Sequence, residues 1–221
     1  MRKNKVVSFI AFLSIGLLAS CSGIGSIGGI KSSGNAKTET RKVSGFKEIK
    51  VGGAVNLEIT VQKDFGLTIE ADDNLLEHIK TDVSGSILTI ETKDNISSKT
   101  RSNIKISLPE LTGLDLSGAS TADVSAVKTD SLKLDASGAS KIKVDGEVKS
   151  LGAVASGASG IDAENLKTEK AKAKASGASN VIVSPVDELD ADASGASSII
   201  YMVEPKNLKQ NASGASTIKR K

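Results

Sequence analysis

Apolar and polar residues alternate with a period of two over most of this chain, and the alternating pattern itself recurs about every nineteen residues. The tetrapeptide Ser-Gly-Ala-Ser occurs six times, with spacings of 20, 19, 20, 18 and 19 residues. The copies begin at Ser117, Ser137, Ser156, Ser176, Ser194 and Ser213. A period of two predicts β-strands with one buried face. The regular spacing predicts a repeat architecture in which each unit stacks on its neighbours.

The copies also share apolar positions on both sides of the tetrapeptide. The residues one and three places before it are mostly Leu or Ala, as in Leu134 and Ala136. The second and fourth residues after it are apolar as well, as in Ile142 and Val144, until Arg220 takes the fourth position in the last copy. Each unit therefore reads as strand, bend, strand and turn. Because so small a unit cannot bury its own apolar face, it must stack.

We therefore predict an all-β fold, a right-handed parallel β-helix (solenoid) of about 19-residue rungs with an irregular, strand-rich N-terminal part. A left-handed hexapeptide helix would need a strict multiple of six, which the drift in spacing disfavours. Glycine suits the sharp bend, the two serines can bond back to the backbone, and the alanine would let the chain approach the axis. Alanine in the interior columns of residues 153–193 predicts a thin cross-section without an internal pocket.

Residues 43–116 alternate too, but without the tetrapeptide until their end. We interpret them as longer, irregular rungs that begin the solenoid and shield its first edge, with one helical turn within residues 75–80. An open parallel edge would invite strand addition. At the other end, the charged residues 219–221 would discourage such pairing.

The first residues resemble the signal peptide of a bacterial lipoprotein. A basic start, an apolar run of about 14 residues and Leu18-Ala19-Ser20 precede Cys21, the single cysteine. The apolar run is shorter than the roughly 20 residues that span a bilayer as a helix. We therefore predict a signal peptide over residues 1–20, lipidation of Cys21, and a flexible Gly/Ser-rich tether over residues 21–42. An ordinary signal peptide followed by a buried cysteine is the alternative.

Composition narrows the function classes. Removing residues 1–20 takes Lys+Arg from 29 to 26 against 26 Asp+Glu, so the remaining chain is formally neutral and nucleic-acid binding loses its electrostatic support. That remainder holds Phe46, Phe65 and Tyr201 as its only aromatics, which argues against base stacking and sugar-stacking platforms. With one His and one Cys, Cys/His metal sites and intrachain disulfides are not expected. We expect no metal and no cofactor.

Candidate chemistry is sparse. Asp115 and Asp135 would occupy the same outward column on adjacent rungs, where paired carboxylates could bind calcium or act as acid and base. The column continues as Val154, Lys174, Asp192 and Asn211, which favours a solvated face. His78 is interpreted as a lone exposed histidine. Ser131 lies in an Asp-Ser-Leu sequence that fits a loose O-glycosylation pattern.

Several segments in order resemble a known family: Val43 to Val51, Val55 to Ile59, Asp72 to Leu76, Leu88 to Ile90, and the repeated Ser-Gly-Ala-Ser. They are similar to the autotransporter adhesin head domain called GIN, which is frequent in exported proteins of Bacteroidetes. The resemblance covers residues 43–218 and implies a single-stranded right-handed β-helix with an adhesive role. The family supplies no common binding residues to carry over. The leader and Cys21 indicate lipid tethering, with no room for an autotransporter barrel.

Three functional hypotheses follow. The leading one is a non-catalytic, lipid-anchored protein of the cell envelope, attached to the outer membrane through Cys21, whose outer face contacts a host, bacterial or glycan surface. The second is a purely structural envelope lipoprotein. The third is a polysaccharide lyase or hydrolase built on a β-helix, which a groove with clustered carboxylates would favour.

Overall fold

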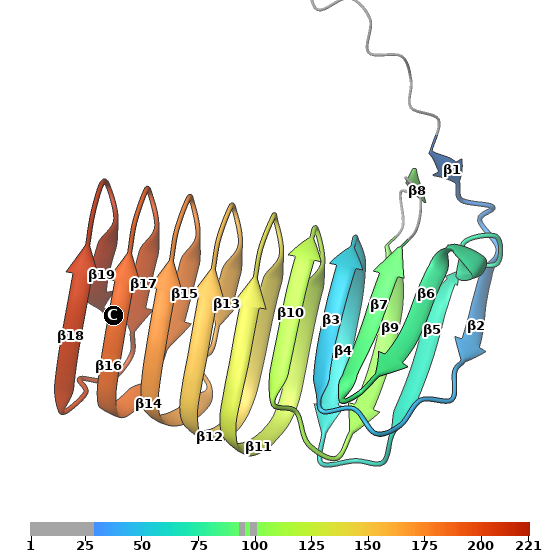
Figure 1. The fold of residues 1–221 in the computed structure, drawn as a ribbon. Coiled ribbons are helices and arrows are strands. Elements are labelled where there is room, and N and C mark those ends of the chain that lie inside the picture. Colours follow the sequence, from blue (N-terminus) through green and yellow to red (C-terminus); the bar gives the residue numbers. More distant parts are fainter. Residues whose placement is uncertain (1–28, 93–95, 98–100) are drawn as a thin grey trace, which may run out of the picture.

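The computed structural model describes residues 29–92, 96–97 and 101–221, and within them it is all-β. Its one helical element is a 3-10 turn, η1 (Leu76–His78), which confirms the single helical turn expected within residues 75–80. Figure 1 shows the strands as a row of successive turns of the chain, with the C-terminus at one end. The turns form two walls of strands that enclose a common apolar interior.

The first wall contains the strands that lead up to the Ser-Gly-Ala-Ser bends. From the N-terminal end its order in space is β6 (Ile79–Ser84), β7 (Ile87–Thr92), β3 (Glu48–Gly53), β10 (Gly113–Gly118), the second halves of β11 (Thr121–Ala136) and β12 (Lys141–Ala155), β14 (Leu166–Ala175), β16 (Pro185–Ala193) and β18 (Asn207–Ala212). All neighbours from β7 onward pair in parallel, and only β6 is antiparallel.

The second wall contains the strands that follow the bends. Its order is β2 (Ala36–Thr40), β5 (Gly66–Asp72), β9 (Ser102–Leu108), β4 (Val55–Val61), the first halves of β11 and β12, β13 (Gly160–Asp162), β15 (Asn180–Val183), β17 (Ser198–Tyr201) and β19 (Thr217–Arg220). β1 (Ile30–Lys31) and β8 (Ile96–Ser97) form a separate two-stranded parallel sheet that belongs to neither wall.

The predicted apolar columns form the interior. Leu134, Ala153, Ala173 and Ala191 are successive paired positions in the first wall, and all four are buried. Ile142, Ile161, Val181 and Ile199 form the facing column of the second wall and are equally buried. Small residues on one side and larger ones on the other fill a narrow space between the walls.

The Ser-Gly-Ala-Ser bends stack directly on one another, as the regular spacing predicts. Gly138 and Gly157 both have positive φ angles, +73° and +75°, a conformation that residues with a Cβ rarely adopt. A Cβ on Gly157 would also lie 2.7 Å from the carbonyl oxygen of Gly138. Glycine is therefore required at the bend both by the backbone conformation and by the closeness of the neighbouring turn.

The second serine of every bend except the last is buried, and its hydroxyl bonds to the neighbouring turn. The Ser179 hydroxyl donates to the carbonyl oxygen of Ala155 at 3.1 Å, and the Ser197 hydroxyl donates to that of Ala175 at 3.0 Å. The alanine of the bend differs from expectation: Ala158 and Ala178 are exposed on the outside of the corner. The residue that points toward the axis is instead the second serine of the bend. Its hydroxyl is small enough to fit inside the corner, where it donates a hydrogen bond to a backbone carbonyl oxygen.

Residues 43–116 depart from the expected series of rungs. The turn made by β3 and β4 lies between the turn made by β7 and β9 and the first regular repeat, so the order in space is not the order in sequence. β5 and β6 pair antiparallel to their neighbours and end the parallel stack. An antiparallel cover satisfies the edge without requiring another full turn of chain.

The flexible tether expected over residues 21–42 is wrong for its second half. β2 pairs antiparallel with β5 from Ala36 to Thr40 and covers that edge. Arg41 then donates to the carbonyl oxygens of Leu76 and Ile79 at 3.0 and 2.6 Å. This strand is mostly polar because it is held by backbone pairing at an edge, so the apolar pattern could not reveal it.

At the opposite end, β18 and β19 each have a partner on one side only among the described residues. All six residues of β18 are exposed, including Leu208 and Ala212, which occupy columns that are buried in earlier turns. The predicted breakdown of the pattern in the last copy is confirmed, since Arg220 is exposed where Tyr201 is buried one turn earlier.

Candidate functional site

The residue predicted to carry the lipid, Cys21, lies outside the described residues. Ser131, in the Asp-Ser-Leu sequence, lies on β11 and is exposed. His78 differs from the expected exposed histidine: its side chain is 24% exposed, and its Nε2 lies 3.6 Å from Oε1 of Glu77.

The predicted neighbourhood of Asp115 and Asp135 is confirmed. The two residues are directly paired positions of β10 and β11 on the outside of the first wall. Partial burial and, secondly, the nearby Asp115 carboxylate raise the pKa of Asp135 above its usual value, while Lys133 opposes this shift. The column then continues through Val154 and Lys174 to Asp192, so the two adjacent carboxylates belong to a mixed row.

The described residues contain no group of three or more His, Cys, Asp or Glu side chains that could hold a metal ion. Two carboxylates on a flat wall also lack the enclosing groups that keep an acid and a base on either side of a substrate. The carboxylate pair is therefore best described as part of the solvated surface of the first wall.

Oppositely charged side chains face one another along both walls. Lys170 pairs with Glu188 at 3.5 Å and Lys172 with Asp190 at 3.8 Å, from adjacent turns of the first wall. On the second wall Lys105 pairs with Glu58 at 3.3 Å. Such exposed pairs contribute little to stability, typically about 0–1 kcal/mol each. They leave flat, regular surfaces that carry both signs of charge.

The corner opposite the Ser-Gly-Ala-Ser bends, here called the base, has a different shape. The base comprises residues 126–130, 145–149, 163–169, 184–187 and 202–206, where the chain passes from the second wall to the first. It carries a groove of about 1010 Å³. Glu110 and Asp130 line one end of this groove, and Val186 and Val203 line the other.

The groove exists because one turn of the chain is short. Asp162 and Thr168 lie on either side of the base in one turn, and the positions paired with them in the next turn are Ile182 and Pro185. With fewer residues to cross the base, the later turn recedes, and Val186 is left 46% exposed beside the protruding turn. The alternating pattern of the sequence did not predict this groove. Its signal was the spacing of 18 between Ser176 and Ser194, the shortest of the five.

The described residues include no helix that is long and apolar enough to cross a membrane. The structure thus defines a class of protein: a stacked β-sheet repeat with an apolar interior, outer walls of mixed charge and a surface groove at the base. The chain belongs to the family described as "Putative auto-transporter adhesin, head GIN domain", which matches residues 45–205. The expected resemblance is confirmed, and this family indicates a cell-surface or envelope location.

Solved structures of similar fold include three from Bacteroides and Parabacteroides species. A "putative adhesin" from Bacteroides fragilis superposes with a TM-score of 0.70 at 23% identity, covering 87% of this chain and 100% of that one. A "putative adhesin" from Parabacteroides merdae gives 0.59 at 19% identity, with 87% and 98% coverage. A "putative lipid binding protein" from Parabacteroides distasonis gives 0.52 at 22% identity, with 87% and 99% coverage. No curated protein matches the sequence.

Proposed function

We propose that this protein is a lipid-anchored interaction protein of the bacterial cell envelope, which binds another surface through the outer walls of a right-handed parallel β-solenoid and catalyses no reaction. The observation that carries the proposal is the filled interior: the columns through Leu134 and Ile142 are buried along successive turns. With no space inside, contacts with other molecules must be made by the outside.

The outer walls suit weak contacts that are repeated many times. Their side chains stand about 4.8 Å apart from turn to turn and carry both signs of charge, as at Lys170 and Glu188. The walls carry almost no aromatic side chains to capture a sugar tightly. Many copies on one cell would gain strength from effective concentration when they touch the same surface. Membership of an adhesin family supports this role.

Anchoring is proposed to occur through Cys21, with the lipid in the outer membrane. The proposal is supported by the sequence Leu18-Ala19-Ser20 before that cysteine and the short apolar run before it. Replacing the thiol, Cys21→Ser, should move the protein from the membrane fraction to the soluble fraction. The matched control Ser22→Ala should stay in the membrane. Unchanged fractionation of Cys21→Ser would refute anchoring through this residue.

The interaction role is tested on whole cells. Cells with and without the protein are compared for attachment to host matrix, to immobilised glycans and to other bacteria, after brief surface proteolysis shows whether the domain faces outward. Loss of attachment in cells without the protein supports the proposal. Equal attachment on every surface would leave the structural alternative.

The absence of catalysis is tested separately with the purified protein and a panel of polysaccharides. Turnover that disappears in Asp115→Ala or Asp135→Ala would overturn the proposal in favour of a glycan-processing enzyme. Turnover that both variants retain would place an activity elsewhere on the molecule and would equally contradict the proposed role.

A further inference from the structure

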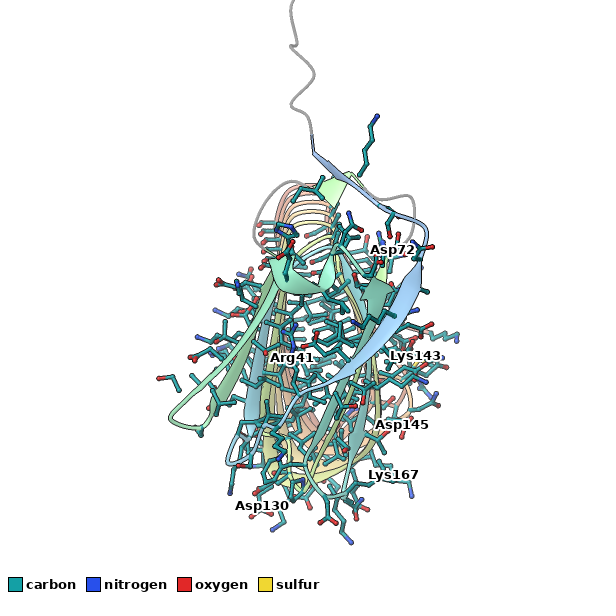
Figure 2. The ribbon with its side chains drawn as sticks, turned by 90° about the vertical axis from the view of Figure 1, so that its right-hand side faces the viewer. Arg41, Asp72, Asp130, Lys143, Asp145 and Lys167 are labelled. Atoms are coloured by element: carbon teal, nitrogen blue, oxygen red, sulfur yellow. The ribbon has the colours of Figure 1, made fainter. Side chains whose placement is uncertain are left out.

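The base carries two parallel columns of charge with opposite order. In three successive turns, paired positions hold Lys128, Glu147 and Lys167. Two residues further along the same turns lie Asp130, Lys149 and Glu169. One column therefore reads plus, minus, plus, and the other reads minus, plus, minus. In the end-on view of Figure 2, the labelled Asp130 and Lys167 project downward and outward from the base.

These side chains are exposed, so their charges are available to another molecule. The Asp130 side chain is 83% exposed and the Lys149 side chain 67%, although their charged atoms lie 2.8 Å apart. The hydrogen bond and charge of Asp130 raise the pKa of Lys149 above its usual value, and Glu169 adds a weaker effect of the same sign. The side chains between the columns, Val148 and Thr168, point inward and are buried.

The pattern is complementary to itself in one arrangement only. Suppose that a second copy faces the base across a two-fold axis parallel to the stack. The column that begins with Lys128 in one copy then lies opposite the column that begins with Asp130 in the other copy, at the same height. Lys128 then faces the second copy's Asp130, Glu147 faces its Lys149, and Lys167 faces its Glu169. A two-fold axis across the stack would instead place Glu147 opposite Glu147. Most soluble homodimers form through isologous contacts around a two-fold axis.

We propose that the base is a self-association surface, through which two copies of this chain dock side by side with their stacks parallel. The residues of both columns line the groove of the base, so this contact would bring the grooves of the two copies face to face.

This inference goes beyond the proposed function, since it concerns a second copy of the chain and leaves both walls free. The contact is only a few turns high and is mostly polar, well below a standard interface of about 1,600 Å² in total. We therefore expect a weak dimer that depends on salt, because exposed charges are screened beyond about 8 Å at physiological ionic strength.

Sedimentation equilibrium tests the proposal on the full-length chain carrying Cys21→Ser, so that no lipid contributes to association. Raising the salt from about 50 mM to about 500 mM should weaken the dimer about tenfold. Glu147→Lys and Lys149→Glu should each be monomeric, because each places like charges opposite one another twice. Mixing these two variants should restore association as a one-to-one heterodimer, in which all facing charges are again opposite.

Lys170→Glu is the matched control, because it reverses an exposed lysine on the first wall and should leave the dimer intact. Circular dichroism of each variant is used to check that the fold is retained. The proposal is overturned if the parent chain is monomeric at low salt, since the two columns then act only within one molecule. It is equally overturned if Lys149→Glu still dimerises, or if the mixed variants remain monomers.

Discussion

The hydroxyl oxygen of Ser159 lies 2.8 Å from the carbonyl oxygen of Ala136, a residue of the preceding turn. The same hydroxyl lies 2.8 Å from the carbonyl oxygen of Ser156 within its own bend. A buried hydroxyl thus joins two consecutive turns at the corner, and comparable bonds recur at Ser140, Ser179, Ser197 and Ser216. The repetition of this bond explains why the motif ends in serine.

Ser159→Ala should lower the free energy of unfolding by about 1 kcal/mol, the usual net value of one hydrogen bond. The loss stays moderate because the Ala136 carbonyl also accepts a bond from the backbone nitrogen of Ser156 at 2.9 Å. Chemical denaturation of purified protein measures the change. Ser156→Ala is the control: Ser156 is half-buried and serves the corner through backbone atoms, so a change below about 0.5 kcal/mol is expected.

Gly157→Ala should be more damaging, with a loss of about 2 kcal/mol or more, because it combines an unfavourable positive φ with a clash. The added Cβ would lie 2.7 Å from the Gly138 carbonyl oxygen. Gly45→Ala and Gly152→Ala are the controls that separate the effect of the positive φ from that of the clash. Gly45 has a φ of +79° with nothing within 4 Å of a Cβ, and Gly152 has neither the positive φ nor a close contact. If all three alanine variants were equally stable, the stacked bend would not explain the glycine.

Arg41→Ala should loosen the N-terminal end of the stack. The guanidinium donates to the carbonyl oxygens of Leu76 and Ile79 and also bonds to Thr81, and the charged bonds together are worth about 2 kcal/mol. Hydrogen exchange should rise in β2, η1 and β6 and remain unchanged in β14 and β16. Lys47→Ala removes an exposed ion pair with Glu110 and serves as the control, with little expected change.

Asp135→Asn should stabilise the protein at neutral pH. Burial and the neighbouring Asp115 raise the pKa of Asp135 in the folded state, so its ionised form is disfavoured by folding. This destabilisation is fully present above the pKa of Asp135 in the folded protein. It disappears as the pH falls through that pKa toward the lower pKa of the unfolded chain. The gain of the variant should therefore be largest near pH 7 and shrink on acidification.

Melting temperatures of both proteins across the acidic range test this expectation. Asp192→Asn is a suitable control, because Asp192 lies in the same column but the adjacent position on β14 is Lys174, which carries the opposite charge. A gain at Asp192 as large as at Asp135 would contradict the explanation through the Asp115 carboxylate.

The regular part of the molecule was determined by the sequence alone. The recurrence of Ser-Gly-Ala-Ser places Gly138 next to Gly157, and the period of two assigns Leu134 and Ile142 to the interior. Such a prediction succeeds because each turn contacts only its neighbours, so one local pattern, repeated, contains the packing and the register. The adjacency of Asp115 and Asp135 follows from the same spacing.

The tertiary structure decided the irregular parts. The pairing of β2 with β5 depends on an open strand edge elsewhere in the chain, which polar residues 36–40 cannot signal by themselves. The groove of the base depends on the short passage from Ile182 to Pro185, and its charge columns follow the register shift between Val124 and Val127. A one-residue bulge changes which side chains face outward in the next turn, and local alternation carries no information about where the backbone will bulge.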